Sequence, residues 1–265
     1  MLLAVDVGNT QTVLGLFEDG ELRADWRAAT EAERTGDEIG ALVARLLALR
    51  DLSFDDVSAV ALASTVPLLV RSYSELAERY AEAPLLVLGP GVKTGIPILY
   101  DDPREVGPDR IANAVAARER YGAPAIVVDF GTSTNFDAVS AAGEYVGGVL
   151  APGIEISMEA LFERAARLTK VDFAAPPSVI GKTTDAALRS GLVYGFAGQV
   201  DGIVGRMREE LGSRAGGQAV GSGNSIPVIA TGGLADLIAP HSRTSERVDP
   251  LLTLEGLRLV WERNR

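Results

Sequence analysis

The stretch Asp6-Val-Gly-Asn-Thr-Gln-Thr12 is matched later in the chain by Asp129-Phe-Gly-Thr-Ser-Thr-Asn135. Each copy follows an apolar run typical of a buried strand, Leu2–Val5 before the first and Ala125–Val128 before the second. A second strand-like run and a polar turn follow each copy. One such turn is weak evidence, because Asp and Gly also form turns for purely conformational reasons. Two copies, one in each half, predict two phosphate-binding hairpins.

The composition limits the classes of function. The chain has 265 residues, of which 47% are hydrophobic and 23% charged, which is typical of a globular protein of about two domains. A net charge of −11 argues against binding to nucleic acid, which requires a basic surface. With no cysteine and a single histidine, His241, a general base is expected to be a carboxylate. No apolar run reaches about 18 residues and no leader precedes the first strand, so we expect a cytoplasmic protein without membrane contact.

Apolar periodicity predicts the same sheet-and-helix unit in each half. In the first half it predicts strands at Leu2–Val5, Thr12–Phe17, Leu22–Arg27, Val57–Ser64 and Leu85–Leu88, with helices from Thr35 and over Leu68–Ala81. In the second half it predicts strands at Ala125–Asp129, Thr134–Ser140, Tyr145–Leu150 and Pro227–Ala230, with helices over Arg110–Tyr121, Glu155–Leu168 and Thr184–Leu211. Thr35 and Glu38 have the spacing of a capping box. The glycine- and serine-rich segment Ser213–Ser225 predicts a surface loop.

The repeated unit, with a phosphate turn at the head of each copy, resembles the actin-like ATPase and sugar-kinase architecture. This resemblance implies an α/β fold of duplicated actin-like (ribonuclease H-like) domains, each a mixed sheet flanked by helices. We expect residues 1–108 to form the first domain and residues 109–265 to form the second.

The predicted helix Thr184–Leu211 carries a stripe of glycines. Their spacing of four, three, four and three residues places them on one side of the helix, at Gly191, Gly195, Gly198, Gly202 and Gly205. Glycine inside a helix costs about 0.8–1 kcal/mol relative to alanine, so the stripe costs roughly 4–5 kcal/mol in total. Another backbone can approach such a stripe closely, either a helix of the same chain or the same helix in a second copy. We favour the second copy, because two-fold dimers are the commonest oligomers.

The stretch Tyr100-Asp-Asp-Pro-Arg-Glu-Val-Gly-Pro-Asp-Arg110 leads into a predicted helix and places Asp109 in its first turn. One interpretation is that Asp109 only caps the helix. In the other, Asp109 accepts a proton from a substrate hydroxyl and Arg110 pairs with a substrate carboxylate or phosphate.

A further glycine pair stands at Ile229-Ala-Thr-Gly-Gly233, where a strand is expected to meet a helix. Glycines there allow a planar ring or a ribose to approach the backbone. Alone the pair is equally typical of a structural turn; after two phosphate turns it fits an adenosine pocket.

With these motifs the chain resembles the type III pantothenate kinases of the acetate and sugar kinase/actin-like superfamily. The resemblance covers nearly the whole chain in order, at Asp6–Thr10, Val106–Arg110, Asp129–Thr132, Gly147-Gly148, Ala151–Ile154, Gly181–Thr184, Ser190-Gly191, Thr231–Gly233 and Leu254–Arg258. The Val-Gly-x-Asp-Arg element is the most discriminating. Asn135 departs from the pattern, since a hydroxyl residue is expected in the second phosphate turn.

The resemblance implies an enzyme that phosphorylates pantothenate with ATP, the first step of coenzyme A biosynthesis. It implies that ATP is held by Thr132, by Gly232 and Gly233 and by the first turn, consisting of Asp6, Val7, Gly8, Asn9, Thr10, Gln11, Thr12 and Val13. It implies that Asp109 is the proton acceptor and that pantothenate is contacted by Tyr100, Gly107, Pro108, Asp109, Arg110 and Thr184. Asp6 would lie near Mg²⁺, and Asp129 would bind K⁺ or NH₄⁺. A homodimer is implied, in agreement with the glycine stripe.

Two other functions stay open at this point. One is a non-catalytic transcription-accessory regulator on the same fold, and the other is a different small-molecule kinase on the same scaffold. The acidic charge and the intact set of Asp6, Asp109 and Asp129 argue against the regulator.

Overall fold

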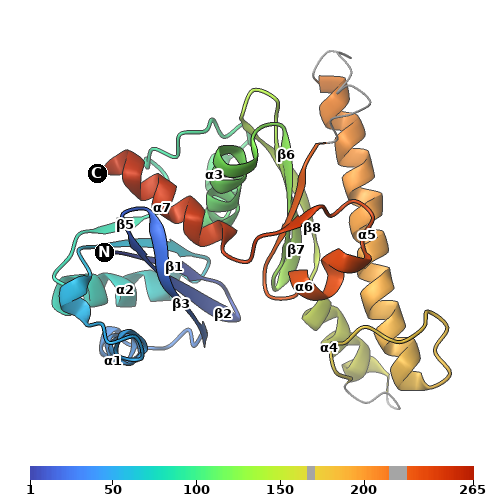
Figure 1. Ribbon diagram of the computed structural model, residues 1–265, viewed down its shortest axis with the longest axis horizontal. Coiled ribbons are helices and arrows are strands. Elements are labelled where there is room, and N and C mark those ends of the chain that lie inside the picture. The colour runs from blue at the N-terminus through green and yellow to red at the C-terminus, as the bar shows by residue number, and fades with distance from the viewer. Residues whose placement is uncertain (166–170, 215–225) are drawn as a thin grey trace. The chain divides into compact units, whose positions relative to one another are not determined.

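The computed structural model describes residues 1–165, 171–214 and 226–265 (Figure 1). The chain forms two compact units. Unit 1 contains Met1–Ala116 and Leu252–Arg265, and unit 2 contains Ala117–Leu251. In these described ranges no helix combines the length and the apolar character that a membrane span requires.

Unit 1 is built on a mixed sheet with the strand order β3-β2-β1-β4-β5. The strands are β1 (Leu2–Val7), β2 (Gln11–Glu18), β3 (Glu21–Ala29), β4 (Ala59–Ser64) and β5 (Leu85–Val87). The first three form an antiparallel meander, and β4 and β5 join it in parallel. All five strands were predicted, although Asp6 and Val7 extend β1 beyond the predicted strand end at Val5.

Helices α1 (Gly36–Ala48) and α2 (Pro67–Arg79) bury one face of this sheet. Ile39, Val43 and Leu47 of α1 pack with Leu69 and Leu76 of α2 against the alternate apolar residues of β1, β2 and β4. The predicted capping box is confirmed: Glu38 N–H donates to Thr35 Oγ1 (3.3 Å) and Thr35 N–H donates to Glu38 Oε2 (2.8 Å). Short 3-10 helices lie at Phe54–Asp56 and Pro103–Glu105.

The C-terminal helix α7 (Leu252–Asn264) also belongs to unit 1, where it packs against β1, β2 and β4. It lies against the start of α3 (Pro108–Tyr121) so closely that a Cβ on Gly256 would overlap the Ala112 carbonyl. Beside this contact, the buried Thr253 hydroxyl donates to Asn113 Oδ1 (2.8 Å). The compact units therefore divide differently from the predicted domains 1–108 and 109–265, because the chain's last helix packs back on the first sheet.

Unit 2 repeats the sheet, in the order β10-β9-β6-β7-β8. The strands are β6 (Ala125–Phe130), β7 (Ser133–Val139), β8 (Tyr145–Pro152), β9 (Val228–Thr231) and β10 (Arg247–Val248). Here too a three-stranded antiparallel meander is followed by two parallel strands. Strand by strand, β6 corresponds to β1, β7 to β2 and β9 to β4, so the predicted duplication is confirmed.

The core of unit 2 lies between this sheet and α4 (Ile154–Arg164), α5 (Thr184–Arg214) and α6 (Ala235–Ile238). A 3-10 helix, Ala239–His241, follows α6. The helix predicted over Glu155–Leu168 is present from Ile154, and its last predicted residues, 166–168, lie outside the described residues. Most of the predicted loop Ser213–Ser225 also lies outside them, but Ser213 belongs to α5 rather than to a loop.

The glycine stripe of α5 is open within the described part of the chain. A Cβ at Gly191, Gly195, Gly198 or Gly205 would meet no other described atom within 4 Å, and one at Gly202 would meet only the Arg206 guanidinium at 3.8 Å. Close packing against another described helix of the same chain is therefore not the reason for the stripe.

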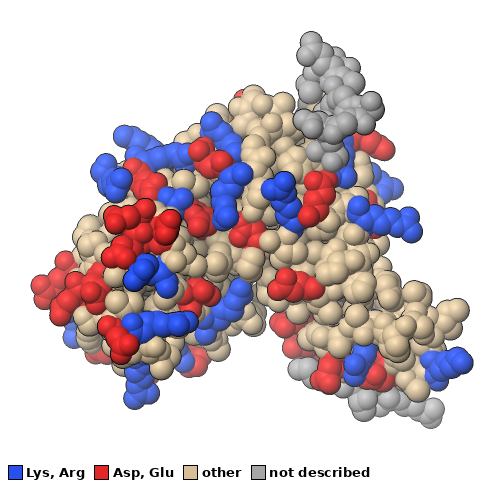
Figure 2. Space-filling view, viewed as in Figure 1, with Lys and Arg blue, Asp and Glu red and all other residues tan. Residues whose placement is uncertain are grey.

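Charged side chains of both signs are interspersed over the face drawn in Figure 2 rather than gathered by sign. Many form surface ion pairs, such as Arg79–Asp37 (2.8 Å) and Arg71–Glu75 (3.0 Å) in unit 1. Exposed pairs of this kind contribute about 0–1 kcal/mol each. The stability of each unit therefore depends mainly on its apolar core.

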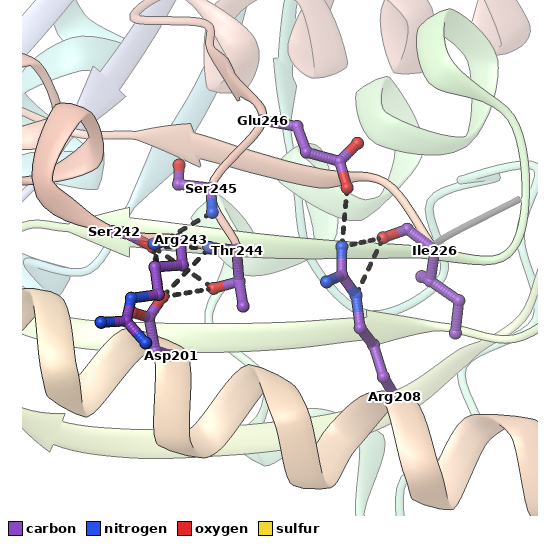
Figure 3. Close-up of polar contacts among 8 residues, drawn as sticks. All are labelled: Asp201, Arg208, Ile226, Ser242, Arg243, Thr244, Ser245 and Glu246. Carbon is purple, nitrogen blue, oxygen red and sulfur yellow. Dashed lines mark hydrogen bonds and ion pairs between the residues drawn. The ribbon is translucent and has the colours of Figure 1, made fainter. Parts of the chain in front are cut away.

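Two polar side chains of α5 bind the segments that precede β9 and β10 (Figure 3). Asp201 Oδ1 accepts hydrogen bonds from the hydroxyls of Ser242 and Thr244 and from the backbone N–H groups of Arg243 and Thr244, at 2.8–3.1 Å. Arg208 donates to the Ile226 carbonyl (2.7 Å) and to Glu246 (2.7 Å). The helix is thus held at two points two turns apart.

Candidate active site

The first predicted phosphate turn is the connection between β1 and β2. Gly8 N–H donates to the Gln11 carbonyl (3.0 Å), which closes a tight turn in which Asn9 and Thr10 are exposed. Asp6 and Val7 lie on β1, and Gln11, Thr12 and Val13 lie on β2, so only the middle of the predicted set forms the turn itself. Asp6 is half-buried at the carboxyl end of β1, in register with Val13 on one side and Ala63 on the other.

The second predicted phosphate turn connects β6 and β7. Gly131 N–H donates to the Ser133 carbonyl (3.0 Å) and Thr132 is exposed. Asp129 occupies the position on β6 that Asp6 has on β1, between Asn135 and Thr231. The N-cap of α4 supports this turn, because Gly153 N–H donates to the Thr132 carbonyl (3.1 Å). A Cβ on Gly153 would overlap the carbonyls of Gly131 and Thr132, so only glycine fits there.

Strand register corrects the interpretation of Asn135. Val7 pairs with Thr12 across the first turn and Phe130 pairs with Thr134 across the second, so the second turn is one residue shorter. The hydroxyl residue equivalent to Thr12 is therefore Thr134. Asn135 lies on β7, not in the turn, and its Oδ1 accepts a hydrogen bond from the Ser133 hydroxyl (2.7 Å).

The glycine pair after β9 also lies beside Asp129. Gly232 has a φ of +89°, which favours glycine, and a Cβ there would overlap Asp129 Oδ1 and the Phe130 backbone. The space beside Gly232 that was predicted for a bound ring is therefore occupied by the side chain of Asp129. Gly233 follows in the turn that leads into α6.

Asp109 is the second residue of α3, as expected from the motif that precedes this helix. Its carboxylate folds back over Gly107, where a Cβ would overlap Asp109 Oδ1. That oxygen is buried and has no hydrogen-bond partner among the described residues. Burial raises the pKa of Asp109, against the opposing effects of the Arg110 charge and of the backbone N–H groups of Arg110 and Asp109. Capping of the helix alone does not account for the buried Oδ1 without a partner.

The remaining predicted residues fall in both units. Arg110, next to Asp109, is buried, and Pro108 begins α3. Tyr100 is half-buried in the connection before the 3-10 helix Pro103–Glu105. Thr184 is exposed at the first position of α5, after Thr183, whose hydroxyl accepts from Ala186 N–H (3.1 Å) and so caps the helix. Unit 1 thus holds the first turn, Tyr100 and the Asp109 motif, and unit 2 holds Asp129, Thr132, Thr184 and the glycine pair.

Sequence reasoning missed the side chains that support these positions. Thr30 lies behind the first turn, Gly153 lies behind the second, and Asn113 holds the start of α3. The only sequence signal at these positions was Gly153, within a matched motif to which no role was given.

Solved structures with related folds include a Campylobacter jejuni protein assigned to the Baf family of transcriptional activators, with a TM-score of 0.57 at 17% identity over 99% of this chain and 98% of that chain. Another is component A of the (R)-2-hydroxyglutaryl-CoA dehydratase of Acidaminococcus fermentans, with a TM-score of 0.50 at 16% identity over 100% and 99%. At such identities the likeness shows the fold alone. It confirms the predicted class, two actin-like mixed sheets flanked by helices.

Sequence relatives extend over the full length. A type III pantothenate kinase of Moorella thermoacetica is 52% identical over 100% of both chains, and one of Acidothermus cellulolyticus is 55% identical over 100% of this chain and 99% of its own. Residues 2–206 match the family model described as type III pantothenate kinase. The predicted resemblance is confirmed: this chain belongs to the type III pantothenate kinase family.

Proposed function

We propose that this chain transfers the γ-phosphoryl group of ATP to pantothenate, giving ADP and 4′-phosphopantothenate, the first step of coenzyme A biosynthesis. The observation that carries the proposal is Asp109, whose Oδ1 is buried without a hydrogen-bond partner in the described structure. In a chain of this family, a carboxylate at the start of a helix with a buried oxygen that lacks a hydrogen-bond partner is the best candidate for the general base.

Asp109 accepts the proton of the primary hydroxyl of pantothenate as the hydroxyl oxygen attacks the γ-phosphorus. The bond from this phosphorus to the β–γ bridging oxygen breaks, and ADP leaves with that oxygen. The raised pKa of Asp109 favours this role, because a base is most effective when its pKa approaches the working pH. The protein otherwise contributes positioning and charge stabilisation, which suffice for phosphoryl transfer.

The two turns bind the phosphates of ATP. The first contributes Gly8, Asn9 and Thr10 with the flanking residues Asp6, Val7, Gln11, Thr12 and Val13, and the second contributes Thr132. The exposure of Asn9, Thr10 and Thr132 supports this assignment, since backbone N–H groups and hydroxyls at tight turns are ligands for phosphate oxygens. Gly232 and Gly233 border the adenosine.

The carboxylates of the two strands suit the cations of the reaction. The described residues contain no group of three or more acidic, His or Cys side chains for a metal ion. A magnesium site in a kinase commonly has one or two carboxylates, with phosphate and water completing it, and Asp6 fits that role. Asp129, which holds on β6 the position of Asp6 on β1, is assigned to K⁺ or NH₄⁺. When bound, these cations offset the charge of the phosphates.

Pantothenate is held by Tyr100, Gly107, Pro108, Asp109, Arg110 and Thr184. The guanidinium of Arg110 pairs with the pantothenate carboxylate, a geometry for which arginine is well suited. The buried position of Arg110 next to the base supports this role.

The enzyme works as a homodimer that packs the open glycine stripe of α5 against its copy. Residues 190–200 of α5 carry no charged side chain, which supports a contact with a second apolar helix. A cytoplasmic location also remains a prediction. Light scattering at micromolar concentration tests the dimer; a monomer contradicts it.

The function is tested by a coupled ADP-release assay with pantothenate, ATP and Mg²⁺, comparing potassium with sodium. Potassium-dependent, pantothenate-dependent ADP release is expected. The proposal fails if the purified chain releases no ADP with pantothenate, and activity with sugars or acetate instead would indicate another small-molecule kinase. The likeness to a Baf-family structure shows the fold alone, so no observation favours a transcription-accessory regulator.

A further inference from the structure

Two threonines from outside the first turn bind the backbone at its two ends. Thr65 follows β4, and both its N–H (2.9 Å) and its hydroxyl (3.1 Å) donate to the carbonyl of Val7, the residue before the turn. Thr30 follows β3, and its N–H donates to the carbonyl of Thr10, the last residue before β2 (2.9 Å). Each end of the turn is therefore fixed by a residue that follows a different strand.

The hydroxyl of Thr30 adds a contact beyond the backbone. It shares a hydrogen bond with the hydroxyl of Thr12 (2.8 Å). Thr12 lies opposite Val7 across the turn, and only 4% of its surface is exposed, so its hydroxyl needs a partner within the protein. Thr30 therefore binds the chain at two places, the last residue of the turn and the second residue of β2.

At the position of Thr30, unit 2 has a glycine. Thr30 and Gly153 each follow the third strand of a meander, and the N–H of each donates to the carbonyl of the last residue of its turn (2.9 and 3.1 Å). Gly153 has no side chain, and Thr134, the equivalent of Thr12, has a buried Oγ1 without a hydrogen-bond partner among the described residues. The backbone bond thus belongs to the repeated fold, whereas the hydroxyl bond is specific to the first turn.

At the position of Thr65, unit 2 again has a glycine. Thr65 lies two residues beyond the β4 partner of Asp6, and Gly233 holds the corresponding place after β9. Both threonine hydroxyls are therefore additions to the first turn alone. The reason for them has to be a requirement of this turn that the second turn does not share.

These bonds fix the direction of the backbone N–H groups of the turn. A carbonyl lies in the same peptide plane as the N–H of the next residue, so a bond to the Val7 carbonyl orients the N–H of Gly8 and a bond to the Thr10 carbonyl orients that of Gln11. Backbone that is ordered before a ligand arrives loses little conformational entropy when the ligand binds. The two threonines therefore favour phosphate binding without touching a phosphate.

We propose that Thr30 and Thr65 are positioning residues for ATP: their hydroxyls hold Gly8–Thr10 in the conformation that binds the phosphates. This inference rests on the proposed function of that turn. It assigns to neither threonine a contact with ATP or with pantothenate.

The test consists of Thr30→Val and Thr65→Val, each of which removes one hydroxyl and keeps the shape of the side chain. Both residues are only half-buried, so both variants should fold. The loss of one neutral hydrogen bond corresponds to a roughly two- to tenfold rise in the Kd and the KM for ATP. The KM for pantothenate should stay within about twofold. Thr30→Ser and Thr65→Ser, which keep the hydroxyls, should restore the constants for ATP.

The matched control is Thr94→Val. Thr94 also lies in unit 1 and is buried, and its hydroxyl donates to a backbone carbonyl within its own connection, that of Ile96 (2.9 Å). The variant loses the same kind of bond as Thr65→Val, away from the turn. It should change neither the Kd nor the KM for ATP.

Titration calorimetry with ATP and Mg²⁺, without pantothenate, separates this inference from the proposed function. Wild type that binds ATP without turning over pantothenate contradicts only the proposed function, and weaker ATP binding by the two valine variants then still supports the inference. The inference is overturned if the folded valine variants bind ATP as the wild type does, if the KM values for both substrates rise equally, or if Thr94→Val weakens ATP binding as much. Wild type that does not bind ATP overturns both proposals.

Discussion

The surroundings of two helical aspartates, Asp109 and Asp201, shift the pKa values of their carboxyl groups in opposite directions. Asp109, at the start of α3, has a buried oxygen without a described hydrogen-bond partner, and its pKa is raised by burial. Asp201, in the middle of α5, is partly buried as well, but one of its oxygens accepts four hydrogen bonds, which outweigh burial and lower its pKa. On the proposed function, the same side chain serves proton transfer in one unit and structural support in the other.

The difference shows how a catalytic carboxylate can be recognised without a ligand. A carboxylate that serves stability collects donors, because each bond to its charged form adds stability. One that serves catalysis has to remain available to a substrate hydroxyl, and the protein then tolerates a buried oxygen with an unmade bond. Activity and stability should therefore respond oppositely when the two residues are neutralised.

The largest effect is expected for Asp109→Asn. Loss of the general base should lower kcat by roughly 10²–10⁴-fold. The melting temperature should be unchanged or higher, because the variant no longer buries a charge with an unsatisfied oxygen. Steady-state kinetics and calorimetry on the same preparation measure both. A large loss of stability with retained kcat would assign Asp109 to helix capping instead.

The pH profile tests the same residue without a substitution. Asp109 acts in its unprotonated form and its pKa is raised. The apparent pKa of the acid limb of the kcat/KM profile should therefore lie above the ordinary aspartate value of about 3.9. At pH values below this apparent pKa, kcat/KM should fall about tenfold per pH unit. Because the pKa of Asp109 is higher in the folded state than in the unfolded state, its contribution to stability is present at pH values below the unfolded-state pKa. This contribution is lost as the pH rises through the folded-state pKa. Consequently, any stability gain of Asp109→Asn should disappear at low pH.

Asp201→Asn should reverse this pattern. Weakening the hydrogen bonds to a charged acceptor should cost about 1–3 kcal/mol in the free energy of unfolding. The turnover per folded molecule should be retained. Because the pKa of Asp201 is lowered, its contribution is present above the unfolded pKa and is lost as the pH falls through the folded one. Urea titrations at pH 7 and at a pH well below the ordinary aspartate pKa of about 3.9 measure the difference, and equal losses at both would contradict the assignment.

Local signals in the sequence predicted much of this structure. The described strands except β10, which was not predicted, the capping box of Thr35 and Glu38 and the position of Asp109 all depend on residues a few positions apart. Such patterns can be recognised in a sequence because strands have a short fixed period and helix caps have a short fixed spacing.

Contacts between distant segments could not be predicted in this way. Asp201 is 41–43 residues from its partners, and Thr253 is 140 residues from Asn113. The return of α7 to the first sheet shifted the division of the chain for the same reason. The interpretation of Asn135 also needed the strand register, since a one-residue difference in turn length moves every later residue.

The smallest effect, and the finest test of the comparison, is expected for Thr244→Val. This variant keeps the shape of the side chain and removes one of the four donors to Asp201. The remaining three should hold the carboxylate, so the free energy of unfolding should fall by only about 0.5–1.5 kcal/mol. Combined with Asp201→Asn in a double-mutant cycle, the two losses should sum to more than the loss in the double variant. Additive losses would mean that Thr244 stabilises its segment independently of Asp201, and the carboxylate would then not be the centre of this structural site.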